Sequence, residues 1–153
     1  MFLPQSVGHI ENAKATSNME FVVEARNKRT KKFIEVILPS MISQLRLKNS
    51  RKVLVVRVSN KDIIDDNEGQ TCYIPVADGI MVVIKPQSFE RMGVTLAHEM
   101  VHVKQMAKGM LKTVNGVNYW KGKCYNRRTK YLNRPWEVEA FSKQELIFRR
   151  AIE

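Results

Sequence analysis

The part of the chain with the clearest chemical signal is His98-Glu99-Met100-Val101-His102, an H-E-x-x-H sequence. On a helix, two residues four positions apart lie on the same face, so both imidazoles would point the same way. Two imidazole nitrogens placed in this way can bind one Zn²⁺ ion per chain. Glu99 would lie beside them and could activate a water held by the metal. The alternative is a solvated helix face that carries two histidines by chance.

A zinc site of this kind needs a third protein ligand if it is to retain the ion and leave one position open for water. No histidine follows His102, and no Asp or Glu occurs between His102 and Trp136. The carboxylates that remain downstream are Glu137, Glu139, Glu145 and Glu153, and the last two lie late in the chain. The spacing therefore leaves Glu137 and Glu139 as the two candidates for the third ligand.

Three amphipathic helices would position these residues. Apolar residues at spacings of three and four predict the motif-bearing helix over 89–108, with Ser88 as its N-cap. The same spacing predicts an earlier helix over 27–47, in which Pro39 is expected to kink or split the helix. A last helix is predicted to start at 133–135, where a proline suits the first turn, and to carry both candidate carboxylates.

Short β-type segments separate these helices. Runs rich in β-branched and aromatic residues predict strands over 52–58, 71–74 and 79–84. Asn-Gly and Lys-Gly pairs within 111–125 predict small hairpins. The segment 21–23 fits either a strand or a helical turn. This order, without an alternation of strand, helix and parallel strand, predicts an α+β fold. We expect a weakly ordered arm over 1–18 and one domain over 19–153.

The composition is that of an ordinary globular domain, but the charge is not. The 153 residues include 26 Lys and Arg against 15 Asp and Glu, a net charge of +11, which favours anionic partners. The two cysteines are too few for a disulfide scaffold, and no signal peptide or membrane span is indicated. We therefore expect a cytoplasmic protein without membrane contact. The sequence does not indicate an oligomeric state.

The basic residues gather in two segments, 26–61 and 104–134, and the second segment also holds Tyr119, Trp120 and Tyr125. Such a distribution fits a solvated surface, a nucleic-acid contact or a surface for an acidic protein. If nucleic acid binds, the candidate phosphate contacts are Arg127, Arg128 and Lys130.

Two stretches together resemble a known class of enzymes. Residues 96–102, which contain the H-E-x-x-H sequence, and Pro135-Trp136-Glu137-Val138-Glu139-Ala140 resemble the gluzincin class of zinc metallopeptidases. More narrowly, the chain resembles small single-domain peptidases of phage and bacterial genomes, near the SprT-like proteins. The resemblance covers about residues 80–148. It implies a zincin-like domain, in which a small mixed or antiparallel sheet packs on the H-E-x-x-H helix and a C-terminal helix carries the third ligand.

The resemblance also implies roles for single residues. His98, His102 and Glu137 would bind zinc, and Glu99 would act as general base and then as proton donor. Glu139 would support the ligands from outside, or replace Glu137. Oxyanion stabilisation would fall to one of three tyrosines, Tyr119, Tyr125 or Tyr131. The strand 80–84 would form the sheet edge that pairs with an extended substrate.

The implied function is hydrolysis of a peptide bond in a protein or peptide substrate, in a bacterial cytoplasm if the protein is phage-encoded. The alternative is a basic nucleic-acid-binding or virion-associated protein that retains a zincin fold without turnover. Many members of the class carry an acidic residue where this chain has Phe141. The acidic residue of those members supports a zinc histidine. Since this chain lacks it, the sequence does not indicate what orients His98 and His102.

Overall fold

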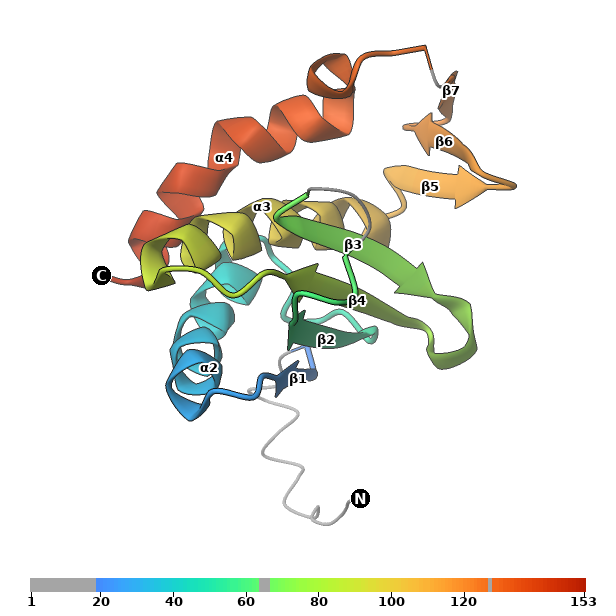
Figure 1. Ribbon diagram of the computed structural model, residues 1–153. Coiled ribbons are helices and arrows are strands. Elements are labelled where there is room, and N and C mark those ends of the chain that lie inside the picture. The colour runs from blue at the N-terminus through green and yellow to red at the C-terminus, as the bar shows by residue number, and fades with distance from the viewer. Residues whose placement is uncertain (1–18, 64–66, 127) are drawn as a thin grey trace.

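The computed structural model describes residues 19–63, 67–126 and 128–153. The arm predicted over 1–18 lies outside these residues. The longer elements are β1 (Phe21–Glu24), α2 (Lys28–Gln44), β2 (Val53–Val58), β3 (Gly69–Ile74), β4 (Gly79–Ile84), α3 (Phe89–Ala107), β5 (Leu111–Val114), β6 (Val117–Trp120), β7 (Lys123–Tyr125) and α4 (Pro135–Ala151). Two short 3₁₀ turns are η2 (Pro75–Ala77) and η3 (Tyr131–Asn133). The arrangement is an α+β fold, as predicted (Figure 1).

The main sheet has the strand order β1-β2-β4-β3, in which β1, β2 and β4 are parallel and β3 is antiparallel to β4. The chain thus contains one strand–helix–parallel strand unit, β1-α2-β2, and the prediction that no such unit is present was wrong. The cause lies in β1, which has four residues and buries only Val23 among them. A segment this short has too little periodicity to separate a strand from a helical turn.

The prediction that the strand 80–84 lies at the sheet edge was also wrong. The strand β4 pairs with β2 on one side and with β3 on the other, so it is internal. Five of its six residues are buried, and a continuous apolar run is typical of a strand covered on both faces. The edge strand on the side of the H-E-x-x-H helix is β3.

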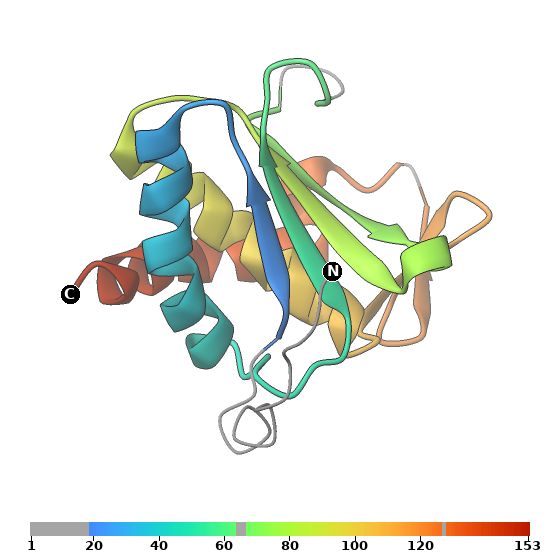
Figure 2. The same cartoon turned by 90° about the horizontal axis from the view of Figure 1, so that it is seen from below.

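The helices form a layer against one face of this sheet (Figures 1 and 2). Side chains of α2, α3 and α4 join the inward residues of β2 and β4 in one core, which includes Ile34, Leu38, Leu54, Val56, Ile80, Val82, Leu96, Met100, Ala140 and Phe148. The helix α2 runs through Pro39 as one element, because its buried apolar stripe offsets the missing backbone hydrogen bond. Among the described residues, no helix is long and apolar enough to cross a membrane.

The ends of the remaining elements follow the predicted signals. Ser88 caps α3 by accepting a hydrogen bond from the Arg91 backbone N–H (3.2 Å), and Pro135 occupies the first turn of α4. The second sheet, β5-β6-β7, is antiparallel. Its two turns contain Asn115-Gly116 and Lys121-Gly122, and all four residues have positive φ. The hairpins predicted within 111–125 are therefore present.

The helices α3 and α4 lie side by side, and their contact positions the site (Figure 1). The closest approach occurs at Gly93 of α3, which lies against the ring of Phe148 of α4. A Cβ atom at position 93 would lie 2.0 Å from Phe148 Cε1 and 2.4 Å from Cδ1. Because the ring is 8% exposed and enclosed by the core, it has little freedom to move aside.

We therefore expect Gly93→Ala to destabilise the protein by about 1–3 kcal/mol, the usual cost of overpacking a core. This loss would occur although alanine favours a helix over glycine by about 1 kcal/mol. Urea unfolding monitored by circular dichroism measures the change. The double variant Gly93→Ala/Phe148→Leu should recover part of the loss. A Gly93→Ala protein as stable as the unchanged one would contradict this close contact.

Candidate metal centre

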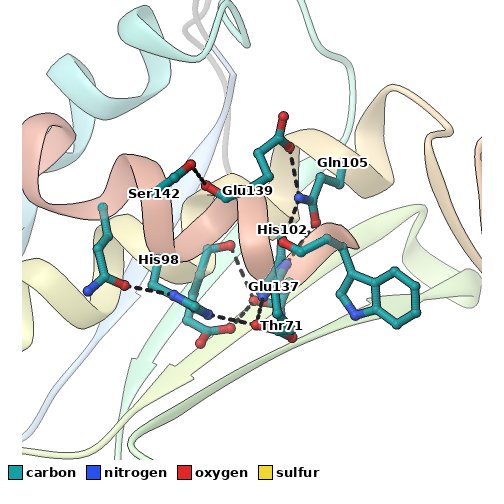
Figure 3. Close-up of polar contacts among 10 residues, drawn as sticks. Thr71, His98, His102, Gln105, Glu137, Glu139 and Ser142 are labelled. Carbon is teal, nitrogen blue, oxygen red and sulfur yellow. Dashed lines mark hydrogen bonds and ion pairs between the residues drawn. The ribbon is translucent and has the colours of Figure 1, made fainter. Parts of the chain in front are cut away.

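Three side chains from two helices meet at one point. His98 and His102 project from one face of α3, and Glu137 projects from the first turn of α4 between them (Figure 3). Glu137 Oε1 lies 3.0 Å from His98 Nε2 and 3.1 Å from His102 Nε2. An ion bound tetrahedrally at about 2.1 Å holds its ligand atoms about 3.4 Å apart, close to these separations. The three residues, each 6% exposed, could therefore hold a metal ion.

Electrostatics favours an ionised carboxylate in this cluster. Burial alone would raise the pKa of Glu137, but hydrogen bonds and charge from His102 and His98 lower it to about 2. Burial likewise opposes a charge on His102, but the hydrogen bond that His102 donates to Glu137 and the charge of Glu99 outweigh it, so the pKa of His102 is raised. The site thus stabilises a negative oxygen against two nitrogens, which suits a cation between them.

His102 is oriented by Gln105, a residue that the sequence analysis did not identify. The Gln105 amide nitrogen donates to the Trp136 carbonyl (3.0 Å) and to Glu139 Oε1 (2.9 Å), which fixes the orientation of the amide. Its oxygen therefore faces His102 Nδ1, 2.7 Å away, and must accept a hydrogen bond from it. With its Nδ1 proton directed at Gln105, His102 meets the cluster through Nε2, which hydrogen-bonds Glu137 and would offer its lone pair to a bound metal ion.

His98 has a corresponding partner. Its Nδ1 lies 2.8 Å from Oε1 of Gln144, and Phe141 packs edge-on against its imidazole with ring centroids 4.6 Å apart. Gln144 follows Glu137 by seven residues, two helical turns, so both lie on one face of α4. The ring of Phe141 thus packs against His98 at the position where many gluzincins have an acidic residue. The polar support of His98 comes from Gln144, one turn further along α4. Helical spacing from Glu137 is the signal that could have identified Gln144.

Glu139 does not face the cluster. Its carboxylate accepts hydrogen bonds from Gln105 Nε2 and from Lys143 Nζ (3.2 Å), which lower its pKa against the opposing effect of burial. Of the two carboxylates left open by the spacing, the structure places Glu137 with the histidines. Glu139 lies behind Gln105 and supports His102 through it.

Glu99 is buried beside the cluster and is held by the edge strand. Thr71 of β3 donates a hydrogen bond from Oγ1 to Glu99 Oε1, at 2.6 Å. Burial is the largest effect on Glu99 and raises its pKa, although the nearby His102 and the bond from Thr71 act in the opposite direction. A raised pKa makes a carboxylate a stronger proton acceptor.

Two cavities open on this cluster. One, of about 570 Å³, is lined by His98, Glu99 and Phe141, and another, of about 250 Å³, is lined by His102, Glu99 and Glu137. Tyr131 lines both, and burial together with the charge of Glu137 raises its pKa. The other two tyrosines proposed as oxyanion donors lie elsewhere. Tyr119 lines a separate cavity near Gly109, and the ring of Tyr125 packs against Trp136.

The second basic segment reaches the cluster, because Arg134 lines the cavity that His102 and Glu137 also line. In both views α2 and the β5-β6-β7 sheet occupy opposite sides of the molecule (Figures 1 and 2). Lys121 lies over the ring of Trp120, and Lys123 over that of Tyr125, each 5.4 Å from the ring centroid. The rings of Trp120 and Tyr125 are half-buried and pack against Trp136. Of the candidate phosphate contacts, Arg128 and Lys130 are exposed, and Arg127 lies outside the described residues.

Comparison of the chain with protein-family models, with curated proteins and with solved structures gives no match. The function of the cluster is therefore inferred from its residues and their geometry. The structure brings together His98, Glu99, His102 and Glu137, which the sequence analysis selected, and adds Thr71, Gln105 and Gln144 to them.

The ligand assignment predicts different outcomes for two neighbouring glutamates. Glu137→Ala should abolish stoichiometric zinc binding because it removes one of three ligands, whereas Glu139→Ala should leave about one zinc per chain. Elemental analysis after dialysis against dilute zinc measures the content. His98→Ala should lose zinc as well. Zinc retained by Glu137→Ala and lost by Glu139→Ala would show that the wrong glutamate is assigned.

The support of His102 can be tested apart from the ligands. Gln105→Leu removes the acceptor of the Nδ1 proton and should weaken zinc binding about 10-fold to 100-fold, as for other outer partners of metal-bound histidines. Gln44→Leu is a matched control, because Gln44 bonds the Ile147 carbonyl (3.0 Å) away from the cluster and should leave zinc affinity unchanged. Competition with a chromophoric chelator measures both constants, and equal constants would exclude this role of Gln105.

Proposed function

We propose that this protein is a zinc-dependent peptidase of the gluzincin type, which hydrolyses peptide bonds in protein or peptide substrates. The observation that carries the proposal is the meeting of His98, His102 and Glu137 around one point, with the buried carboxylate of Glu99 beside it. The cavities on either side give a substrate access to these groups. The H-E-x-x-H sequence and the glutamate of the following helix support the same assignment.

Zinc is the metal that best suits these donors. Two imidazole nitrogens and one carboxylate oxygen are a common three-residue set for catalytic zinc, with a fourth position left for water or substrate. Glutamine partners on both Nδ1 atoms direct the Nε2 atoms at the ion. When bound, Zn²⁺ would polarise the substrate carbonyl and lower the pKa of the attacking water.

The remaining groups have roles in the transfer of protons and charge. Glu99 accepts a proton from the attacking water and passes it to the nitrogen of the leaving amine as the carbon–nitrogen bond breaks. Its raised pKa makes the ionised carboxylate a stronger proton acceptor. Tyr131 has a raised pKa, so it keeps its phenolic proton and can donate a hydrogen bond to the oxyanion that forms on the substrate.

The edge strand β3 can bind an extended substrate and fix the direction in which it lies. An extended peptide can pair with the outer edge of β3, which follows α3 along the cavities and contributes Gly69 to both. This role replaces the one expected for 80–84, because β4 is paired on both sides.

The decisive experiment separates metal binding from turnover. The zinc-loaded protein is incubated with a mixture of unfolded proteins, and new peptide termini are identified by mass spectrometry. Glu99→Gln should retain zinc but lower kcat by about 10²-fold to 10⁴-fold, since the proton acceptor is lost. Glu35→Gln on the exposed face of α2 is the matched control and should cleave normally. Cleavage that survives in Glu99→Gln, or no cleavage by the unchanged protein, would refute the peptidase and favour a protein without turnover.

A further inference from the structure

The face of β3 that looks toward α3 carries two residues next to Glu99. Gly69 and Thr71 are two positions apart in one strand and therefore point to the same face. Thr71 Oγ1 lies 2.6 Å from Glu99 Oε1, a length typical of a hydroxyl that donates to an ionised carboxylate. The contact joins residues of two different elements, so it fixes the side chain of Glu99 relative to the sheet.

A threonine hydroxyl has one hydrogen to donate. Its other acceptor nearby is the backbone oxygen of Glu99, at the longer distance of 3.3 Å. The Thr71 hydroxyl therefore donates its hydrogen bond to Oε1 of Glu99. The side of Oε1 that faces Thr71 is then not available for a proton from elsewhere. Among the residues that the structure describes, Oε2 of Glu99 has no hydrogen-bond partner. The two oxygens of the carboxylate thus differ in their surroundings.

Gly69 keeps the space beside Oε2 free. A Cβ atom at position 69 would lie 3.1 Å from Glu99 Oε2, 3.0 Å from Glu99 Cγ and 2.9 Å from Thr95 Cγ2. Any side chain there would press on the carboxylate or displace it. Gly69 and Glu99 line both cavities, so this part of the strand and the Glu99 side chain border the space open to a substrate.

We propose that Thr71 is the positioning residue for proton transfer by Glu99: it holds Oε1, and Gly69 leaves Oε2 open to receive the proton. In this arrangement the O–H bond of the attacking water breaks and its proton binds to Oε2. The same proton then passes to the nitrogen of the leaving amine as the carbon–nitrogen bond breaks. The inference rests on the proposed peptidase function, but the hydrogen bond itself can be tested without turnover.

The sheet makes Thr71 a rigid support. Thr71 is opposite Val82 in the ladder between β3 and β4, and Gly69 is opposite Ile84, so the backbone of both is held by an internal strand. A group held on a strand is placed more accurately than one on a loop. An error of about 1 Å in the position of a catalytic group can cost about 10²-fold in rate.

The kinetic test removes only the hydroxyl. Thr71→Val has nearly the same shape and should lower kcat by about 10-fold to 100-fold while KM and zinc content stay unchanged. Thr71→Ser restores a hydroxyl and should recover most of kcat. Thr30→Val on α2 is the matched control and should behave as the unchanged protein. Equal kcat in Thr71→Val and the unchanged protein, or no recovery in Thr71→Ser, would overturn the positioning role.

A second test does not depend on activity. In urea unfolding of the zinc-loaded protein, Thr71→Val should reduce the ratio of folded to unfolded protein about 10-fold, because Oε1 loses its donor. In a Glu99→Leu background the same substitution should have little effect, since the acceptor is absent. Equal losses in the two backgrounds would overturn the contact. Absence of hydrolysis by the unchanged protein, with coupling present, would refute the peptidase and the proton transfer but leave the contact standing.

Discussion

A carboxylate buried between two imidazoles is the interaction on which the site depends. Burying Glu137 without partners would be costly, and the histidines on α3 provide the compensation. The two helices must therefore meet within hydrogen-bond distance at this point. Away from this point they meet again where Gly93 admits the ring of Phe148. The crossing of α3 and α4 thus follows from one polar contact and one steric one, and both are needed to place the ligands.

The glutamines around the cluster orient the histidines without adding negative charge. Gln105 and Gln144 accept the Nδ1 protons of the two histidines through neutral oxygens, so Glu137 is the one carboxylate among the three candidate ligands. Glu139 does not contact the histidines directly. Its carboxylate accepts hydrogen bonds from the amide of Gln105 and from Lys143. A neutral support orients an imidazole without adding charge to the ion, so a bound cation would keep more of its ability to polarise a carbonyl.

The sequence predicted features that are encoded in local spacing. The helical repeat of α3 puts His98 and His102 on one face, and the glycines of the β5-β6-β7 turns were recognised for the positive φ that they adopt. The strand order was not predicted, because pairing depends on residues far apart in the chain. Thr71 lies 28 residues before Glu99, and Gln105 meets Glu139 across 34 residues, so no local pattern connects them. The internal position of β4 was misjudged for the same reason, whereas β1 stayed open because its four residues carry too little periodicity.

The basic β5-β6-β7 sheet can be understood as part of the support of Glu137. Trp136, the residue before Glu137, packs against the rings of Trp120 and Tyr125. Lysines lie over these two rings, which contributes a cation–π attraction while the ammonium groups stay near solvent. No acidic residue lies between His102 and Glu137, so no other carboxylate within that segment competes for the ligand position. Trp120 and Tyr125, each with a lysine over its ring, thus pack against the start of the helix that presents Glu137.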